Sequence, residues 1–583
     1  MKAASMSLRG RLERLYSRVA SHVESQPFGI DVSDGLAPVV QRACSRIPHP
    51  VVRVFKLLLL VLVLFIAFLN LPSLRPYTTD LVLNTKDLRQ PILNTASPDD
   101  HKATQPASSS NHVMDCGADI DRLAKLRDRF KLDDEVEYLK RYVRITREPI
   151  ERQQRTFLQQ RFLPEDDEGQ GLQVLDLTKN VQHEQTCPEP LEIAVTQSPS
   201  PTEADLSDFI FAISTDVKRM RDPLIVDEWA FWLTNGLGHS NGGKLFLRLI
   251  DASDSELTDA AQRLAEAGID AQVSALDSRL HREMAVRYLD LVPMLYFHPD
   301  SVNRKWLVLC DDDTFFTSAH SLVERFKQYD HEKLFYVGSL SEDAIAVKTH
   351  GSQAFGGAGV FISRPLAQVL STVHQTCKTR AKIRQSNTGW GPQGDILLRN
   401  CIYDNTDIRL SQLHGLWQLD IRGDASGFYE SGLSAYSIHH FKGGTKWHTT
   451  YPLNTTKIAY TCGEDCPYQR FITEDDFIIA NGYSVAQYPY GVEFNLDQVE
   501  RTFRPLMVEK EWNFDYMYGP QRPSLSGTGK KISWELGEAE TNLEDGVTIQ
   551  TYIRRKDDVR WTTEDGKPMK SVDGIIELVW ISA

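Results

Sequence analysis

Hydrophobic runs alternate with amphipathic stretches between residues 191 and 450. Short apolar runs predict buried strands, and apolar positions three or four residues apart predict helices. The expected strands are Asp208–Ser214, Lys244–Ile250, Ile269–Val273, Trp306–Cys310, Phe335–Val337 and Gly359–Ser363, and the expected helices include Ser255–Ala267 and Arg279–Phe297. This alternation predicts an α/β fold, in which a mostly parallel sheet carries helices on both faces.

The N-terminal part of the chain has a different pattern. Val51–Leu71 is almost continuously apolar and long enough to cross a bilayer. Basic residues crowd its N-terminal flank, which predicts a cytoplasmic tail at 1–50 and a single-pass anchor at 51–71. A buried core helix and the apolar part of a signal peptide are the alternatives. The fifty residues before the span and the lack of a cleavage site after it disfavour the signal peptide.

Three further segments flank the α/β domain. Residues 72–118 are polar and rich in Ser, Thr and Pro, which predicts a flexible stem. Residues 119–190 begin with a charged, helix-like pattern and are expected to form a helical stalk. Residues 451–583 are expected to form a small β-rich appendage, with strands near Gly546–Arg554 and Gly574–Ile581.

Charge and cysteine content narrow the choice of partners and compartment. The net charge is -14, distributed as +5 in residues 1–71 and about -19 in the rest, which argues against nucleic-acid binding. Seven of the eight cysteines follow the predicted span, so they would lie in an oxidising lumen. Cys310 lies in a predicted strand and is expected to be a buried thiol, whereas Cys377–Cys401 and Cys462–Cys466 are the expected disulfides. No paired Cys-x-x-Cys spacing supports zinc. The sequon at Asn454 predicts a glycosylation site.

Three consecutive acids, Asp311-Asp312-Asp313, follow the predicted strand that ends at Cys310. The strand would deliver these carboxylates to the C-terminal edge of the sheet, where open α/β sheets bind ligands. A hard divalent cation would neutralise their mutual repulsion and could also balance a sugar-nucleotide diphosphate. A solvated acidic loop is the bland alternative.

Three later motifs could complete such a site. The turn Phe355-Gly-Gly-Ala-Gly-Val360 allows close backbone approach to a ligand, although a simple tight turn would look the same. Asp395 would begin a helix, either as a cap or as a general base for an acceptor hydroxyl. His439 and His440 end a predicted strand and would face opposite sides, so at most one serves the site as a cation ligand. A surface histidine pair is the alternative.

In order and spacing these motifs resemble the Fringe-like glycosyltransferases of the family 31 group, and specifically their fungal and plant Fringe-related branch. The resemblance covers about residues 190–450. It implies a GT-A-type, Rossmann-like mixed sheet, a UDP-sugar donor, Mn²⁺ and inversion at the anomeric carbon.

The resemblance also assigns residues. It places metal ligands at Asp311, Asp313 and His439, and the catalytic base at Asp395. Donor nucleotide-binding positions fall at Thr215, Lys218, Arg219 and Asp312, and the substrate-lining turn at Gly356, Gly357, Ala358 and Gly359. The family has a pair of acids before this helix. The corresponding segment here is Gln393-Gly394-Asp395, which has only one carboxylate. The doublet leaves the identity of the histidine ligand open between His439 and His440.

These observations together predict a type II Golgi or ER membrane glycosyltransferase with a lumenal catalytic domain. It would transfer a hexose or N-acetylhexosamine from a UDP-sugar to a hydroxyl of a glycan or glycoprotein acceptor, in a β1,3-type linkage by resemblance. A catalytically inactive Fringe-like glycan-binding or scaffold protein and a metal-dependent hydrolase are the alternatives.

Overall fold

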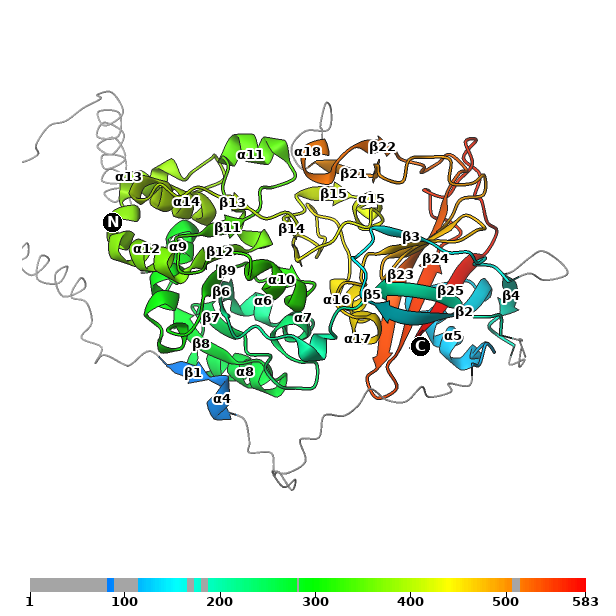
Figure 1. Cartoon of the computed structure of the whole chain (residues 1–583), viewed down its shortest axis with the longest axis horizontal. Helices are drawn as coiled ribbons and strands as arrows, with labels where there is room; N and C mark the ends of the chain where they lie inside the picture. Colours follow the sequence, from blue (N-terminus) through cyan, green and yellow to red (C-terminus); the bar gives the residue numbers. More distant parts are fainter. Residues whose placement is uncertain (1–80, 89–113, 165–171, 180–186, 280–282, 506–513) are drawn as a thin grey trace, which may run out of the picture. The chain divides into compact units, whose positions relative to one another are not determined.

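The structure is a computed structural model that describes residues 81–88, 114–164, 172–179, 187–279, 283–505 and 514–583. Residues 80–583 form one compact unit. Two large sheets account for most of this unit (Figure 1). We call the part around the first sheet, residues 209–450, the α/β region, and the part around the second sheet the β region.

Eight strands within the described residues form the sheet of the α/β region, in the order β1-β8-β7-β6-β9-β12-β11-β13. The neighbours β8, β7, β6 and β9 are parallel, whereas β12 pairs antiparallel with both β9 and β11. The strand bounds are β1 Val82–Asn84, β6 Phe209–Asp216, β7 Lys244–Ile250, β8 Ala271–Leu276, β9 Trp306–Leu309, β11 Tyr336–Gly338, β12 Val360–Ser363 and β13 Ser411–Gln412. The predicted mixed α/β architecture is therefore present.

Helices cover both faces of this sheet because its central strands are apolar on both sides. On β6, Phe209 and Phe211 pack with α7, α8 and α10, while Ile210 and Ala212 pack with α9, α12 and α14. Figure 1 shows the second group on one side of the sheet and the first group on the other. The helices are α6 Val217–Met220, α7 Ile225–Leu233, α8 Asp254–Glu266, α9 Met284–Phe297, α10 Ala319–Phe326, α11 Ala344–His350, α12 Arg364–Cys377, α13 Arg380–Gln385, α14 Gly394–Asn405 and α15 Ser426–Tyr429.

The β region is larger than the small appendage that the sequence predicted. Ten of the described strands form its sheet, in the order β3-β17-β18-β19-β23-β24-β25-β2-β4, with β5 also paired to β2. Their bounds are β2 Glu135–Glu148, β3 Arg155–Phe157, β4 Gln173–Asp176, β5 Leu191–Thr196, β17 Arg470–Ile472, β18 Phe477–Ala480, β19 Ser484–Gln487, β23 Ile532–Asn542, β24 Val547–Arg554 and β25 Asp573–Ser582. Strands from both sides of the α/β region in sequence thus share one sheet.

Short elements complete the described chain. The strands β10 Phe315–Phe316, β16 Ser437–Ile438 and β14 Leu416–Trp417 form a small sheet. The other elements are α4 Thr85–Leu88, α5 Ile120–Phe130, α16 Pro452–Thr456, α17 Ala459–Cys462, α18 Asp515–Tyr518, β15 Ile421–Gly423, β20 Val499–Arg501, β21 Phe503–Pro505 and β22 Gln521–Pro523, with 3₁₀ turns at Pro201–Glu203, Pro299–Ser301 and Gly356–Ala358.

The predicted helical stalk is wrong beyond Phe130. Within the described residues of 119–190 the only helix is α5, which ends at Phe130, and the chain then enters β2, which is flanked by β25 on one side and by β4 and β5 on the other. Val136, Leu139 and Val143 have the spacing of a helix face, but Tyr138 and Tyr142 between them are also buried. Aromatic and β-branched residues in this density favour a strand.

The predicted flexible stem is also wrong in part, because residues 82–88 are ordered against the first sheet. The strand β1 pairs antiparallel with β8. Thr85 is fully buried, and its hydroxyl bonds the backbone at Ile269 and Ala271. A three-residue strand is too short to be recognised from sequence. It forms here because the edge strand β8 offers unpaired backbone groups for hydrogen bonding.

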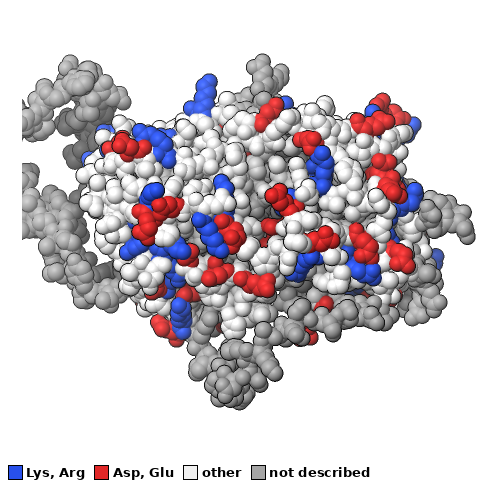
Figure 2. Space-filling model, in the orientation of Figure 1, with Lys and Arg blue, Asp and Glu red and all other residues white. Residues whose placement is uncertain are grey.

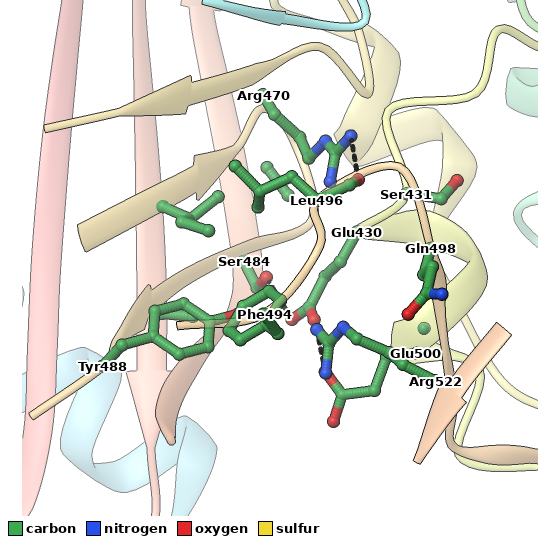
Figure 3. A pocket seen from close by; sticks show the side chains of 14 residues that line it. Glu430, Ser431, Arg470, Ser484, Tyr488, Phe494, Leu496, Gln498, Glu500 and Arg522 are labelled. Carbon is green, nitrogen blue, oxygen red and sulfur yellow. Dashed lines mark hydrogen bonds and ion pairs between the residues drawn. The ribbon is translucent and has the colours of Figure 1, made fainter. Parts of the chain in front are cut away.

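A buried charge cluster joins the α/β and β regions, and Figure 3 shows three of its members, Glu430, Glu500 and Arg522. The Nζ of Lys531 lies 2.5 Å from the Oε2 of Glu430, just after α15, and 3.1 Å from the Oε2 of Glu500. Arg522 also pairs with Glu500, at 2.9 Å. Lys531 is fully buried, and removal of any one partner would leave an uncompensated charge, which is strongly destabilising.

Three disulfides form among the described cysteines: Cys377–Cys401, Cys462–Cys466 and Cys116–Cys187. The first two are the pairs expected from the sequence. Cys310 is a buried free cysteine, as expected. Asn454 is half-buried in α16, and the threonine that completes its sequon, Thr456, is fully buried. Glycosylation at Asn454 stays a prediction.

The predicted membrane span, residues 51–71, lies outside the described residues, as does the predicted cytoplasmic tail. Within the described ranges, no helix combines the length and hydropathy needed to cross a membrane. On the face viewed in Figure 2, acidic and basic side chains are interspersed rather than gathered in one basic patch.

Candidate active site

The small sheet explains how Asp313 and His439 meet. The strand β10 begins two residues after Asp313, and β16 ends one residue before His439. The two strands are antiparallel, with Phe315 opposite Ile438, so the residues just outside the pairing are neighbours. The Nε2 of His439 lies 2.9 Å from the Oδ1 of Asp313 and 3.7 Å from the Oδ2 of Asp311.

The glycine turn, residues 356–359, accepts hydrogen bonds from the segment that precedes β10 and from β16. The Thr314 hydroxyl accepts a hydrogen bond from the Asp311 backbone and donates one to the carbonyl of Gly357. The hydroxyl of Ser437, in β16, donates to the carbonyl of Ala358. All four residues of the predicted substrate-lining turn, from Gly356 to Gly359, are buried. Gly356 and Gly357 line the cavity described below.

Gly357 has no side chain because His439 occupies the space. A Cβ at Gly357 would lie 2.1 to 2.4 Å from three atoms of the His439 ring, which is far inside contact distance. The imidazole is 3% exposed, so it has little room to move away. The glycine in this turn therefore sets the position of the histidine.

We expect Gly357→Ala to displace His439 and weaken Mn²⁺ binding by about 10–100-fold, the usual cost of disturbing the support of a metal ligand. Titration calorimetry with MnCl₂ measures this. Gly537→Ala is the control, since the added Cβ would crowd a ring and an aliphatic side chain in the β region, at 2.8 Å from Phe130 and 3.0 Å from Ile553, and would not meet His439. Equal Mn²⁺ affinity in Gly357→Ala and the wild type would contradict the assigned role.

Asp311, Asp313 and His439 form a donor set suited to a hard divalent cation. Two carboxylate oxygens and one imidazole nitrogen lie within 4.8 Å of one another. This combination of oxygen ligands with one nitrogen suits manganese and related cations. Of the doublet, His439 is the residue that faces the carboxylates, which answers the question that the sequence left open.

The electrostatics of these three groups are strongly coupled. Burial opposes a charge on His439, but the two carboxylates outweigh it and raise its pKa to about 9. Burial likewise disfavours ionised Asp313, yet His439 and its hydrogen bond hold the Asp313 pKa well below its usual range. Asp311 has a half-exposed side chain, and its partial burial and the adjacent acids raise its pKa against the effect of His439. A bound cation would take the place of the imidazole proton.

Asp312 points away from this donor set. Its carboxylate accepts two hydrogen bonds from the Arg219 guanidinium, at 3.0 and 2.7 Å, and one from the Thr215 hydroxyl. Arg219 also lies 3.4 Å from Asp313. The predicted nucleotide-binding residues Thr215, Arg219 and Asp312 are therefore together, and they connect α6 to the acidic turn. Lys218 is exposed on α6.

Asp395 lies at the start of α14, in a cavity of about 560 Å³ that also reaches Asp311 and His439. One oxygen of its carboxylate accepts a hydrogen bond from the Ile396 backbone N–H at 2.8 Å. Burial raises the pKa of Asp395 above the usual aspartate value. A carboxylate with a raised pKa beside a metal-ligand set matches the requirements of a general base.

Besides His440, the cavity has lining residues that the sequence did not single out as functional. His440 faces Asp420, with 2.9 Å between Nδ1 and Oδ1, and its ring stacks on Trp447. Asp420 is buried and also accepts a hydrogen bond from the Ser341 hydroxyl. Tyr288 and the exposed Trp390 line the same cavity. Tyr288, Asp420 and Trp447 lie outside the motifs recognised in the sequence, so no local motif identifies them.

Sequence comparison with known families supports the same interpretation. Residues 250–420 match a family described as Fringe-like, and residues 347–578 match one described as a protein of unknown function, DUF604. The first match contains the acidic triplet, the glycine turn and Asp395. The second contains Asp395, His439 and most of the C-terminal strands. A search of curated protein sequences found no relative.

Solved structures show only remote similarity to this chain. Mouse xyloside xylosyltransferase 1, apo form, is 12% identical over 40% of this chain and 97% of its own, with a TM-score of 0.27. The glycosyltransferase GlyE of Streptococcus pneumoniae TIGR4 is 17% identical over 35% and 44% of the two chains, with a TM-score of 0.22. The mannosyltransferase PcManGT of Pyrobaculum calidifontis, in complex with GDP-Man and Mn²⁺, is 10% identical over 40% and 64%, with a TM-score of 0.24.

At TM-scores this low, the structural likeness carries no argument, and the assignment rests on the sequence families. The Fringe-like match contains three of the four motifs that form the candidate site, and the second match contains the fourth. Residues 250–420 are therefore similar to the Fringe-like family, and this match supports glycosyltransferase activity.

Proposed function

We propose that the protein is a metal-dependent, inverting glycosyltransferase with a GT-A-type catalytic region. It transfers a hexose or N-acetylhexosamine from a UDP-sugar to a hydroxyl of a glycan or glycoprotein, in a β1,3-type linkage. The observation that carries this proposal is that Asp311 and His439, which form one potential cation site with Asp313, line the same cavity as Asp395.

Asp311, Asp313 and His439 would hold the cation, for which Mn²⁺ is the candidate. When bound, a divalent cation neutralises the diphosphate of the donor and the charge on departing UDP. The protein contributes a preformed cluster, because the glycine turn and the pairing of β10 with β16 fix the donor atoms before any ligand arrives. Such preorganisation avoids the cost of rearranging ligands on binding.

Arg219 and Thr215 would act on the donor side. Both bond the Asp312 carboxylate, which ties the acidic turn to the end of β6 and to α6. Arg219 is half-buried, and its charge can attract the donor diphosphate as well as the acids. Lys218, exposed on the next position, is suited to contact the nucleotide from the solvent side.

Asp395 would accept the proton of the acceptor hydroxyl as that oxygen attacks the anomeric carbon. In a single displacement the acceptor approaches from the face opposite UDP, which inverts the anomeric configuration. The cavity, of about 560 Å³, has room for a sugar and is lined by both Asp395 and the ligand candidates Asp311 and His439. The raised pKa of Asp395 improves its strength as a base at neutral pH.

The remaining expectations concern location. We infer that residues 51–71 anchor the protein as a single-pass type II membrane protein, with residues 80–583 in the lumen of the Golgi or ER. Three disulfides among the described cysteines support an oxidising compartment.

A donor screen tests the proposed activity. Purified full-length protein with Mn²⁺ is incubated with UDP-galactose, UDP-N-acetylglucosamine or UDP-glucose, with and without a panel of glycan acceptors. We expect one donor to release UDP in an acceptor-dependent and Mn²⁺-dependent manner. UDP release from no donor, or release that does not depend on acceptor, would contradict transferase activity.

A further inference from the structure

Trp390 is a large apolar residue that lies open at the candidate active-site cavity. It is 68% exposed, and it lines the same cavity as Asp311, Asp395 and His439. Among the tryptophans that the structure describes, it is the only one that is mostly exposed, since the others are buried or half-buried. A ligand that enters the cavity can therefore reach the indole directly.

A closed loop holds Trp390 in this place. Asn387 and Pro392 pair as an antiparallel bridge, and the side-chain oxygen of Asn387 accepts hydrogen bonds from the backbone of Gly389 at 2.9 Å and of Gly391 at 3.2 Å. These two glycines flank Trp390 with φ of 101° and 95°, a conformation that favours glycine. The loop is thus fixed through its backbone, and the indole is left uncovered.

The surroundings of Trp390 distinguish it from an ordinary exposed residue. Single apolar side chains are common on protein surfaces and need no function. Trp390, however, lines a concave cavity of about 560 Å³, to which Met284, 48% exposed, and the half-buried Trp447 add further apolar surface. Apolar and aromatic walls with a few convergent polar groups are typical of small-molecule binding sites.

The position of Trp390 relative to Asp395 indicates which substrate it meets. The two residues lie five positions apart, on the segment that leads into α14. Thr215 and Arg219, which would act on the donor nucleotide, do not line this cavity. A general base must lie within hydrogen-bond reach of the hydroxyl that it deprotonates, so the acceptor occupies the part of the cavity beside Asp395.

A sugar ring has an apolar face that matches an indole. The axial C–H bonds on one face of a pyranose present hydrogens with a partial positive charge, and the face of an aromatic ring is negative. We propose that the indole of Trp390 stacks against the pyranose ring of the acceptor and so orients the hydroxyl that Asp395 deprotonates. This inference rests on the proposed function and adds to it a binding residue for the acceptor sugar.

The stacking contact predicts a loss that is specific to the acceptor. Trp390→Ala removes the aromatic face and leaves the glycines and the bridge of the loop in place. Truncation of an aromatic anchor that buries apolar surface typically weakens binding by about 5–30-fold, so we expect the acceptor KM to rise by that factor. Trp390→Phe keeps a smaller aromatic face and should lose less. The donor KM and the affinity for UDP should not change.

Initial rates measured with full-length protein and Mn²⁺ test this expectation. The acceptors are the methyl glycosides of galactose, glucose, mannose and N-acetylglucosamine, together with larger glycans, and the donor is the UDP-sugar that the wild type uses. Acceptor and donor are varied separately, and calorimetry with UDP and Mn²⁺ checks the nucleotide site. Tyr490→Ala is the matched control, because Tyr490 is 71% exposed but does not line the cavity, and it should change none of these values.

The outcomes distinguish this inference from the proposed function. If the wild type transfers sugar and Trp390→Ala keeps the wild-type acceptor KM, the stacking contact is wrong while the transferase proposal stands. If Trp390→Ala raises the KM of donor and acceptor alike, or weakens UDP binding, its role is structural and the inference is overturned. If the wild type transfers sugar to none of the acceptors, both the inference and the proposed function fail.

Discussion

Replacing Asp395 with asparagine is expected to reduce glycosyl transfer by about 10²–10⁴-fold, the usual contribution of a positioned general base. Asparagine has nearly the same shape but cannot accept a proton from the acceptor hydroxyl. Its side-chain oxygen can still accept the hydrogen bond from the Ile396 backbone, so the N-terminus of α14 should remain unchanged. Initial rates of UDP release at saturating donor and acceptor measure the effect.

The control and the pH profile sharpen this test. Asp404→Asn removes a carboxylate from the same helix, where Asp404 pairs with Lys382 at the surface, and should leave the rate unchanged. In the wild type, activity should fall as the pH is lowered through the raised pKa of Asp395, because the protonated acid is no longer a base. The residual activity of Asp395→Asn should not show this fall at low pH. Turnover equal to that of the wild type would remove Asp395 from the mechanism.

Asp313→Ala is expected to abolish Mn²⁺-dependent UDP binding. Loss of an outer-shell partner costs about 10–100-fold in metal affinity, and the loss of a ligand should exceed that. Asp313 is also the closest carboxylate to His439, so its removal frees the imidazole from the position that completes the donor set. Calorimetry with UDP, in the presence and absence of MnCl₂, gives the Mn²⁺-dependent part of the affinity directly.

Asp227→Ala is the matched control for this experiment. Asp227 is an exposed acid in the first turn of α7, and it does not line the cavity. Its removal should leave both UDP affinities unchanged. If Asp313→Ala keeps the same Mn²⁺-dependent increase in UDP affinity as the control, the cation binds elsewhere and the metal assignment is wrong.

The sequence predicts the α/β region well because its signals are local. Each central strand is a short apolar run, and Asp311–Asp313 follow one of them directly, so strand order alone places carboxylates at an edge of the sheet. The roles of His439 and Asp395 came from family resemblance. The structure adds the physical reason for the meeting of Asp313 and His439, namely the antiparallel pairing of β10 with β16.

The β region could not be predicted in the same way. Its sheet combines β2, which precedes the α/β region, with β25 at the end of the chain, and such long-range pairing leaves no local pattern. The strand β1 is similarly defined by the edge of β8 rather than by its own three residues. In the active site, the sequence does not show that Trp390 is exposed at the cavity, because that depends on the folded loop between Asn387 and Pro392.

The central claim is that Asp311, Asp313 and His439 bind one divalent cation beside Asp395. Anomalous diffraction from crystals of the protein grown with MnCl₂ and UDP, measured at the manganese absorption edge, tests it directly. The account predicts one strong peak about 2.0–2.6 Å from the Asp313 carboxylate and the Nε2 of His439, the distance range of hard divalent cations. The absence of a peak between these side chains, with UDP bound in the crystal, would contradict the account.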